Sequence, residues 1–346
     1  MIAMNQPREQ IELAGLNTLH VSARARYFIE VHEVAELSQA LAWADDRQMP
    51  VLILGGGSNL VFTGDYPGLV IRMCIRGRHW EQIQDQQATL VLAAGENWHQ
   101  SVLYAARAGY RGIENLALIP GTAGAAPVQN IGAYGVELCD SLESVMALDR
   151  HSGELVELSC EDCCFGYRDS LFKQVRDRYV IIEIRLRLSR NGPLKLGYRE
   201  LEEYLDTGRE SGLEAIDVAE AVMAIRRRKL PDPAQIPNAG SFFKNPVVAR
   251  EEYLDLQARF PDIVGYPQEQ GVKLAAGWLI DRCGWKGFRN ERVGVHGQQA
   301  LVLINHGGGS GRDIMALAEE IRESVLAKFG VQLETEPGLV GERKPD

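Results

Sequence analysis

Apolar and polar residues alternate with two different periods along the first third of the chain. Val34, Leu37 and Leu41 recur at helical spacing, so residues 34–47 are predicted to form an amphipathic helix. Short apolar runs bounded by turn residues are typical of strands. The same reasoning predicts three strands and a second helix, at residues 51–54, 69–73, 90–94 and 97–108.

The second half of the chain shows the same two periods. Residues 180–188 alternate between aliphatic and charged side chains, which predicts a half-buried strand in an antiparallel or mixed sheet. A helix is predicted at 216–228, but three prolines within 230–237 cannot continue it, so the main domain boundary is expected there. The last long helix is predicted at 313–329, and the charged tail from Gly341 is expected to fray.

Composition then limits the classes of protein to consider. The 346 residues include 37 Lys and Arg against 47 Asp and Glu, a formal net charge of −10, which disfavours general nucleic-acid binding and docking on anionic lipid. The longest charge-free stretch, 115–136, contains two prolines and four glycines, so it is not expected to span a membrane. No signal-peptide pattern opens the sequence and the six cysteines are expected to be reduced, which predicts a cytoplasmic protein.

Several common motifs are incomplete. Gly55 and Gly57 follow a predicted strand, but the third glycine of a dinucleotide fingerprint falls at Leu60, which disfavours a Rossmann site. The sequence has no Gly-Lys pair of a P-loop and no serine in a Gly-x-Ser-x-Gly turn. Cys160-x-x-Cys163-Cys164 lacks a second pair of ligands, so no metal site is predicted.

Two glycine-rich stretches are the first candidates for ligand binding. Gly55-Gly-Gly-Ser-Asn59 exposes successive backbone N–H groups, which is typical either of a pyrophosphate-binding nest or of a tight turn without a ligand. Residues 119–135 contain four glycines, four alanines and no charge, so their backbone can lie flat against a large planar group. The alternative is a structural loop, although loops of this length inside a domain are usually functional.

Four further positions are candidates for chemistry. Arg168 follows Phe165-Gly-Tyr and can bind a carboxylate with two guanidinium nitrogens, or form a surface ion pair. The basic run 226–229 can bind a nucleotide diphosphate, or be a solvated helix end. Ser241 can donate a proton, although most serines do no chemistry. If residues 333–336 form a strand, Glu334 and Glu336 point the same way, one structural and the other catalytic.

Together and in this order, these stretches resemble the UDP-N-acetylenolpyruvoylglucosamine reductase family. The resemblance spans residues 52–336 and rests on Leu54-Gly-Gly-Gly-Ser-Asn59, Ile119-Pro-Gly with Asn130-Ile-Gly-Ala-Tyr-Gly135, Phe165-Gly-Tyr-Arg168 and Asn238-Ala-Gly-Ser-Phe-Phe-Lys-Asn-Pro246. The last motif and Tyr198 are similar to the longer, type I form, which has an extra substrate-covering loop. The family usually has an apolar and a basic residue where Pro337-Gly338 follow Glu336 here.

The resemblance implies an α+β fold, with a two-lobed FAD-binding domain of the vanillyl-alcohol-oxidase type and a C-terminal α+β substrate-binding domain. It implies three parts: a first lobe at 1–76, to which 330–346 return, a second lobe at 77–229 with the extra loop near 190–210, and a substrate-binding domain at 230–329.

The resemblance also implies the reaction. NADPH reduces bound FAD and leaves, UDP-N-acetylglucosamine enolpyruvate enters the same site, and flavin N5 delivers a hydride to its methylene carbon. Protonation of the resulting enolate gives UDP-N-acetylmuramate, a peptidoglycan precursor. The implied partners are therefore NADPH and a sugar nucleotide, with no nucleic acid or membrane, and the implied state is a monomer. A different substrate for the same fold, or a non-catalytic flavin-binding protein, are the alternatives.

Matching the motifs residue by residue assigns roles in this sequence. Ser241 corresponds to the serine that protonates the enolate, and Arg168 and Glu336 to the pair beside the substrate carboxylate and enolate. Matching also implies five substrate-binding residues: Tyr134, Tyr198, Arg226, Lys229 and Asn245. The implied FAD-binding residues are Gly55, Gly56, Gly57, Ser58, Asn59, Pro120, Gly121, Thr122, Gly124, Ala125, Asn130 and Gly132.

Overall fold

The computed structural model describes residues 6–205 and 212–341. The chain forms two compact units. The first contains the segment up to Ile11, Ala25–Gly56 and Pro67–Arg228, and the second contains Glu12–Arg24, Gly57–Tyr66 and the chain from Lys229. The tail after Gly341, where fraying is expected, and residues 206–210 of the predicted extra loop lie outside the described residues.

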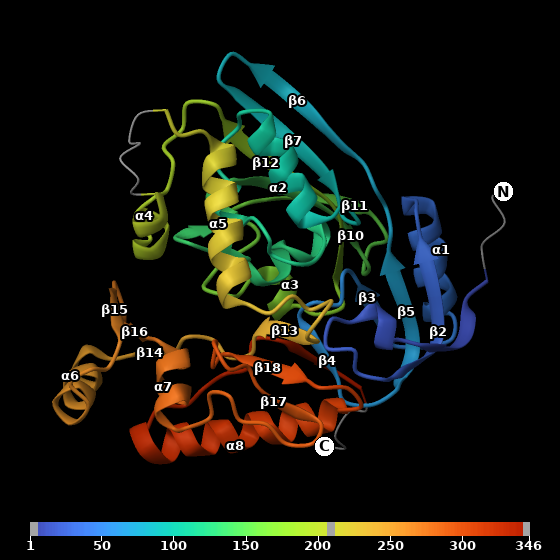
Figure 1. Cartoon of the computed structure of the whole chain (residues 1–346). Helices are drawn as coiled ribbons and strands as arrows, with labels where there is room; N and C mark the ends of the chain where they lie inside the picture. The colour runs from blue at the N-terminus through green and yellow to red at the C-terminus, as the bar shows by residue number, and fades with distance from the viewer. Residues whose placement is uncertain (1–5, 206–211, 342–346) are drawn as a thin grey trace. The chain divides into compact units, whose positions relative to one another are not determined.

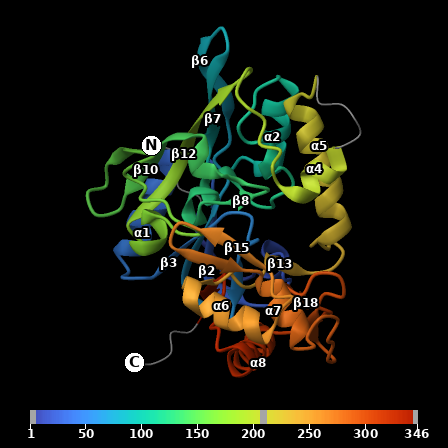
Figure 2. The ribbon, with the colours of Figure 1, turned by 90° about the vertical axis from the view of Figure 1, so that its left-hand side faces the viewer.

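A five-stranded antiparallel sheet is the centre of the first unit (Figure 1). Its order is β11 (Leu155–Ser159), β10 (Leu142–Asp149), β12 (Tyr179–Ser189), β7 (Gln87–Ala93) and β6 (Arg78–Gln84). The strand predicted at 180–188 is β12, and its antiparallel neighbours confirm that prediction. Leu186 and its same-face neighbours are buried under α2 (Trp98–Arg107) and α5 (Ala215–Lys229), which lie on the same face of the sheet (Figures 1 and 2).

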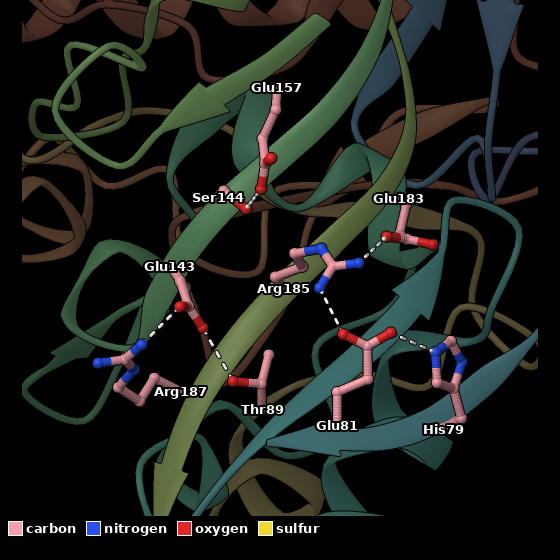
Figure 3. Close-up of polar contacts among 9 residues, drawn as sticks. All are labelled: His79, Glu81, Thr89, Glu143, Ser144, Glu157, Glu183, Arg185 and Arg187. Atoms are coloured by element: carbon pink, nitrogen blue, oxygen red, sulfur yellow. Dashed lines mark hydrogen bonds and ion pairs between the residues drawn. The ribbon is translucent and has the colours of Figure 1, made fainter. Parts of the chain in front are cut away.

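The opposite face of this sheet carries charged side chains that pair with one another across the strands (Figure 3). Arg185 contacts Glu81 of β6 at 2.7 Å and Glu183 at 3.3 Å. On the same face, Thr89 of β7 donates a hydrogen bond to Glu143 of β10 at 2.9 Å. The strict alternation of the sequence therefore reflects one apolar and one charged face of the same sheet.

A second core lies beside this sheet, within the first unit. It belongs to a four-stranded sheet of order β1 (Arg8–Glu12), β2 (Arg24–Val31), β5 (Tyr66–Met73) and β3 (Val51–Leu54). Helix α1 (Val34–Asp45) buries Leu37 and Leu41 against it, as the helical spacing predicts. Leu148 and Ile182 from the five-stranded sheet join the same core, so the two sheets of this unit pack on each other.

Within the described residues, the second unit contains three small sheets and three α-helices. Its strands are β13 (Asn238–Ser241), β18 (Val302–Asn305) and β17 (Val293–Val295); β14 (Val247–Val248), β16 (Gly271–Leu274) and β15 (Gly265–Gln268); and the parallel pair β4 (Leu60–Phe62) and β19 (Gly338–Val340). Its helices are α6 (Arg250–Arg259), α7 (Ala276–Arg282) and α8 (Gly311–Phe329). Figure 1 shows α8 below strands β17 and β18. Ser310 and Asp313 form a capping box at the start of α8. Gly330, with φ 75°, ends the helix where the predicted helix at 313–329 ends.

Segments far apart in the sequence complete the second unit. The amide of Thr63 donates to the carbonyl of Val340 at 2.7 Å. The buried side chain of Asn305 donates from Nδ2 to the carbonyl of Leu19 at 2.9 Å. The core of this unit therefore depends on hydrogen bonds between its first two segments and its last one.

Candidate functional site

Two of the predicted FAD-binding loops approach each other closely in the first unit. A Cβ atom built on Gly56 would lie 2.9 Å from Cα of Gly121, and one built on Gly55 would lie 2.6 Å from Oγ1 of Thr122. The backbone of Gly121 leaves no room for a side chain at position 56, because it cannot move aside as a side chain can. Glycine is therefore required at Gly56, which faces backbone, whereas a side chain at Gly55 would displace the Thr122 hydroxyl.

The second of these loops is held rigidly at the junction between β7 and α2. The amide of Ala123 donates to the carbonyl of Glu96, and that of Gly124 to the carbonyl of Ala94, both at 2.9 Å. A Cβ on Gly124 would lie 2.5 Å from the Cβ of Ala94. The loop therefore lies directly against the end of β7 and is hydrogen-bonded to the residues that follow it.

A cavity of about 130 Å³ adjoins these loops. Four predicted cofactor residues line it: Gly55, Thr122, Gly124 and Ala125. The remaining lining residues are predominantly apolar: Ile53, Met73, Ala94, Val128, Phe172, Tyr179, Val180 and Ile181. Because whole-ligand pockets usually measure about 300–1,000 Å³, this cavity suits one aromatic ring of a larger cofactor rather than all of it.

The rest of the first glycine loop belongs to the second unit. Gly57 has φ 61°, and a Cβ there would lie 2.0 Å from the carbonyl oxygen of Leu16, so only glycine fits. The carbonyl of Gly57 accepts from the amide of Thr18 at 3.0 Å, and that of Asn59 accepts from the amide of Gly338 at 3.0 Å. Gly338, the second residue of the unexpected Pro-Gly pair, therefore holds the end of this loop.

The Arg168 side chain is directed onto the backbone of the other predicted cofactor loop. Its Nη2 donates to the carbonyl of Gly132 at 2.8 Å, and its Nη1 to the carbonyl of Asn130 at 3.4 Å. Arg168 itself has φ 55°, a left-handed conformation that non-glycine residues rarely adopt. A Cβ on Gly132 would lie 2.9 Å from Nη1, so the glycine leaves the space that the guanidinium occupies.

Asn130, predicted to bind FAD, is fully buried and its side chain is used inside the protein. Nδ2 donates to the Glu137 carboxylate at 2.9 Å and to the Gly166 carbonyl at 3.3 Å, while Oδ1 accepts from the Cys139 amide at 3.1 Å. The side chain therefore joins the loop at 130–132 to the turn that bears Arg168. Sequence reasoning missed Glu137, although it is the first charged residue after the charge-free stretch.

Two tyrosines and two arginines gather in the first unit. The rings of Tyr134 and Tyr198 pack edge to face, with centroids 5.0 Å apart and planes at 72°. Burial raises the pKa of Tyr134 to about 12, so its phenol is neutral. Burial also lowers the pKa of Arg226, and the positive charge of Arg168 lowers it further. Two cations close to each other in a partly dry site favour a bound anion.

In the second unit, the segments that contain Ser241 and Glu336 lie next to each other. The amide of Glu336 donates to the carbonyl of Phe242 at 2.9 Å. Among the described residues, the segment around Glu336 makes one β-bridge, between Thr335 and Phe243, instead of the strand considered from its sequence. Glu334 forms an exposed ion pair with Lys244 at 3.0 Å, which is the structural role expected for one of the two glutamates.

Two asparagines shape the backbone around Ser241. Oδ1 of Asn238 accepts from the amide of Gly240 at 2.9 Å, and Gly240 has φ 72°, so the chain turns immediately before Ser241. Oδ1 of Asn245 accepts from the amide of Ala276 at 3.0 Å, the first residue of α7. The predicted substrate residue Asn245 therefore also holds the start of a helix.

The described part of the chain contains no group of three or more His, Cys, Asp or Glu side chains able to hold a metal ion.

Two family models match the sequence. The first, described as "FAD binding domain", covers residues 25–159, and the second, "UDP-N-acetylenolpyruvoylglucosamine reductase, C-terminal domain", covers residues 232–340.

Full-length relatives carry the same description. The chain is 50% identical over 333 residues to UDP-N-acetylenolpyruvoylglucosamine reductase of Pseudomonas aeruginosa, covering 96% of this chain and 98% of that protein. The protein of the same name from Ralstonia nicotianae is 50% identical over 334 residues, covering 94% and 96%. The chain belongs to the UDP-N-acetylenolpyruvoylglucosamine reductase family.

A solved member of this family shares the fold. The crystal structure of the reductase from Thermus caldophilus is 26% identical, covers 96% of this chain and 99% of its own, and superposes with a TM-score of 0.67. These comparisons confirm the family and the predicted fold class, an FAD-binding domain followed by the C-terminal domain of the reductase family. The roles of single residues and the three-part domain division stay predictions.

Proposed function

We propose that this chain reduces UDP-N-acetylglucosamine enolpyruvate to UDP-N-acetylmuramate, with FAD as its bound cofactor and NADPH as its electron donor, in the synthesis of peptidoglycan precursors. Family membership over nearly the whole chain supports the reaction. The observation that carries the proposal is structural: the close backbone contact between Gly56 and Gly121 occurs in the same unit as the pair Arg168 and Arg226.

The residues present fit FAD. The glycine loop at 55–59 would bind the pyrophosphate through backbone N–H groups, because a nest of successive amides binds anions without a charged side chain. The apolar cavity beside Gly55 and Ala125 would hold one of the aromatic rings. Residues 119–135 would face the flavin. When bound, FAD supplies the hydride transfer from NADPH to the enolpyruvyl group.

The remaining chemistry would come from side chains that the family motifs assign to the reaction. Arg168, already oriented by the carbonyl of Gly132, would stabilise the negative charge that hydride addition places on the enolate and its carboxylate. Ser241 would donate its hydroxyl proton to the enolate carbon that bears the ether oxygen. Glu336 would stabilise the enol as an acid. Tyr134, Tyr198, Arg226, Lys229 and Asn245 would bind the sugar nucleotide.

The proposal is tested by anaerobic absorbance spectroscopy of the purified protein. NADPH is expected to bleach the oxidised-flavin band, and the enolpyruvyl sugar nucleotide is expected to restore it. UDP-N-acetylglucosamine, which lacks the enolpyruvyl group, is the matched control and should leave the flavin reduced. Bleaching without recovery by the enolpyruvyl substrate would favour the alternative, an FAD oxidoreductase of the same fold with a different substrate.

Three finer points belong to the same proposal. No helix in the described part of the chain is long and apolar enough to cross a membrane. We place the enzyme in the cytoplasm because NADPH and sugar nucleotides are made there, and we take it to act as a monomer, which light scattering would test. The type I form, with Tyr198 on an extra loop, is likewise proposed.

A further inference from the structure

The polypeptide that leaves β12 is bound by a short segment that follows α2 in the first unit. Arg111 and Ser189 exchange backbone hydrogen bonds of 2.7 and 3.2 Å, so the chain leaves the sheet from a fixed point. Beyond this point, residues 190–198, here named the Tyr198 segment, have no strand or helix of their own before α4 (Arg199–Leu205). Their position must therefore come from contacts with other parts of the unit.

The guanidinium of Arg111 supplies the first of these contacts. Nη1 donates to the carbonyl of Gly192 at 2.8 Å, near the start of the Tyr198 segment. Nη2 donates to the carbonyl of Leu213 at 3.5 Å, on the far side of α4. One side chain therefore contacts the backbone both before and after the helix that follows Tyr198.

Asn115 supplies the second contact, and it is completely buried. Its Nδ2 donates to the carbonyl of Lys195 at 2.8 Å and to the carbonyl of Tyr134 at 2.9 Å. Because both acceptors are carbonyl oxygens, the orientation of the amide is fixed. Tyr134 also has φ 51°, a conformation that needs support from its surroundings.

The same amide leaves one polar atom unsatisfied. Oδ1 of Asn115 is buried and has no hydrogen-bond partner among residues 6–205 and 212–341. A buried acceptor without a partner is unfavourable, so this position is not explained by stability alone. A role in holding the two carbonyls at a set separation explains why an amide occupies the site.

We infer that Arg111 and Asn115 are positioning residues that hold the Tyr198 segment so that Tyr198 packs against Tyr134 at the sugar-nucleotide site. This inference rests on the proposed function. Asn115 contacts the backbone of one tyrosine directly and the backbone three residues before the other. The edge-to-face pair of rings, 5.0 Å apart, is the result of that arrangement. Both residues act through Tyr198 and need not touch the substrate.

A double-mutant cycle with steady-state kinetics tests the inference. Asn115→Asp keeps the shape of the side chain but replaces the amide that donates to two carbonyls with a carboxylate, which cannot donate. We expect it to raise the KM for the enolpyruvyl sugar nucleotide about tenfold, within the range found for directly coupled neighbours, and to change kcat much less. In a Tyr198→Ala background the same substitution should raise KM no further. Asn191→Asp, on the exposed part of the same segment, is the matched control for added charge.

The outcomes separate the inference from the proposed function. If the unmodified protein does not turn over the enolpyruvyl substrate, the proposed function fails. If it does, and Asn115→Asp raises KM equally with and without Tyr198, the residue is merely structural and the inference is wrong. Should Asn115→Asp fail to fold, Arg111→Lys carries the same cycle, because lysine keeps the charge but lacks the planar fork that reaches two carbonyls.

Discussion

Replacing Gly56 by alanine tests whether backbone contact between the glycine loops is needed for FAD binding. The added Cβ would lie 2.9 Å from Cα of Gly121, whereas carbon atoms pack at about 3.5–4.0 Å. The loops must therefore separate by roughly 0.6–1.1 Å. Gly121 is held by the amide of Trp98 at 3.2 Å, so the separation strains a fixed structure. Overpacking of this kind costs about 1–3 kcal/mol.

This cost divides between stability and cofactor affinity. If the loops separate in the apoprotein and must close on FAD, the whole cost appears in the dissociation constant, which rises by about 5- to 140-fold. Flavin-fluorescence titration of the deflavinated protein measures that constant. Thermal unfolding without FAD measures the part of the cost that lowers the stability of the apoprotein. Gly15→Ala is the control, because its Cβ would meet no atom within 4 Å. A Gly56→Ala variant that matches this control in both measurements would refute the reasoning.

Three further outcomes are expected. Gly132→Ala should lower kcat per bound flavin by displacing Nη1 of Arg168, which lies 2.9 Å from the new Cβ; an unchanged kcat per flavin would contradict the role of Arg168. Ser241→Ala should leave flavin reduction by NADPH intact and slow reoxidation by substrate about 10²–10⁴-fold in stopped-flow absorbance, the usual contribution of a general acid. Burial and nearby arginines lower the pKa of His99 below its usual 6.5, so the unfolded chain binds more protons and stability falls as pH drops below 6.5. His99→Gln should weaken that dependence in denaturation at pH 5 to 7, whereas an identical slope would show that other groups cause it.

The regular elements were predictable because their patterns depend on local burial. The alternation at 180–188 and the spacing of Leu37 and Leu41 each report one buried face, and both elements formed as predicted. The segment at 333–336 is different. Its bridge to Phe243 depends on a partner about ninety residues away, which no local pattern reveals.

Features of the candidate site could be predicted where the backbone requires one residue type, such as glycine. They could not be predicted where a side chain binds partners that are distant in the sequence. Gly56 and Gly124 stand out because only glycine allows such close backbone contact. The role of Asn130 at FAD stays a prediction from its motif, whereas the hydrogen bonds of its buried amide to Glu137 and Cys139 are visible only in the structure. Asn115 gave no signal at all, because the two carbonyls that it binds come together only in the folded chain.

The three-segment composition of the second unit also has a consequence for how the chain is made. All residues of the first unit have been synthesised once Arg228 has left the ribosome. Gly57–Asn59, by contrast, lie in a unit whose strand β4 pairs with β19 at Gly338–Val340. At about 5–20 residues per second, this pairing is delayed by roughly 15–60 s after Gly57 is made. The loop proposed to bind the pyrophosphate is therefore completed last, so a nascent chain would acquire FAD only after its final strand has been translated.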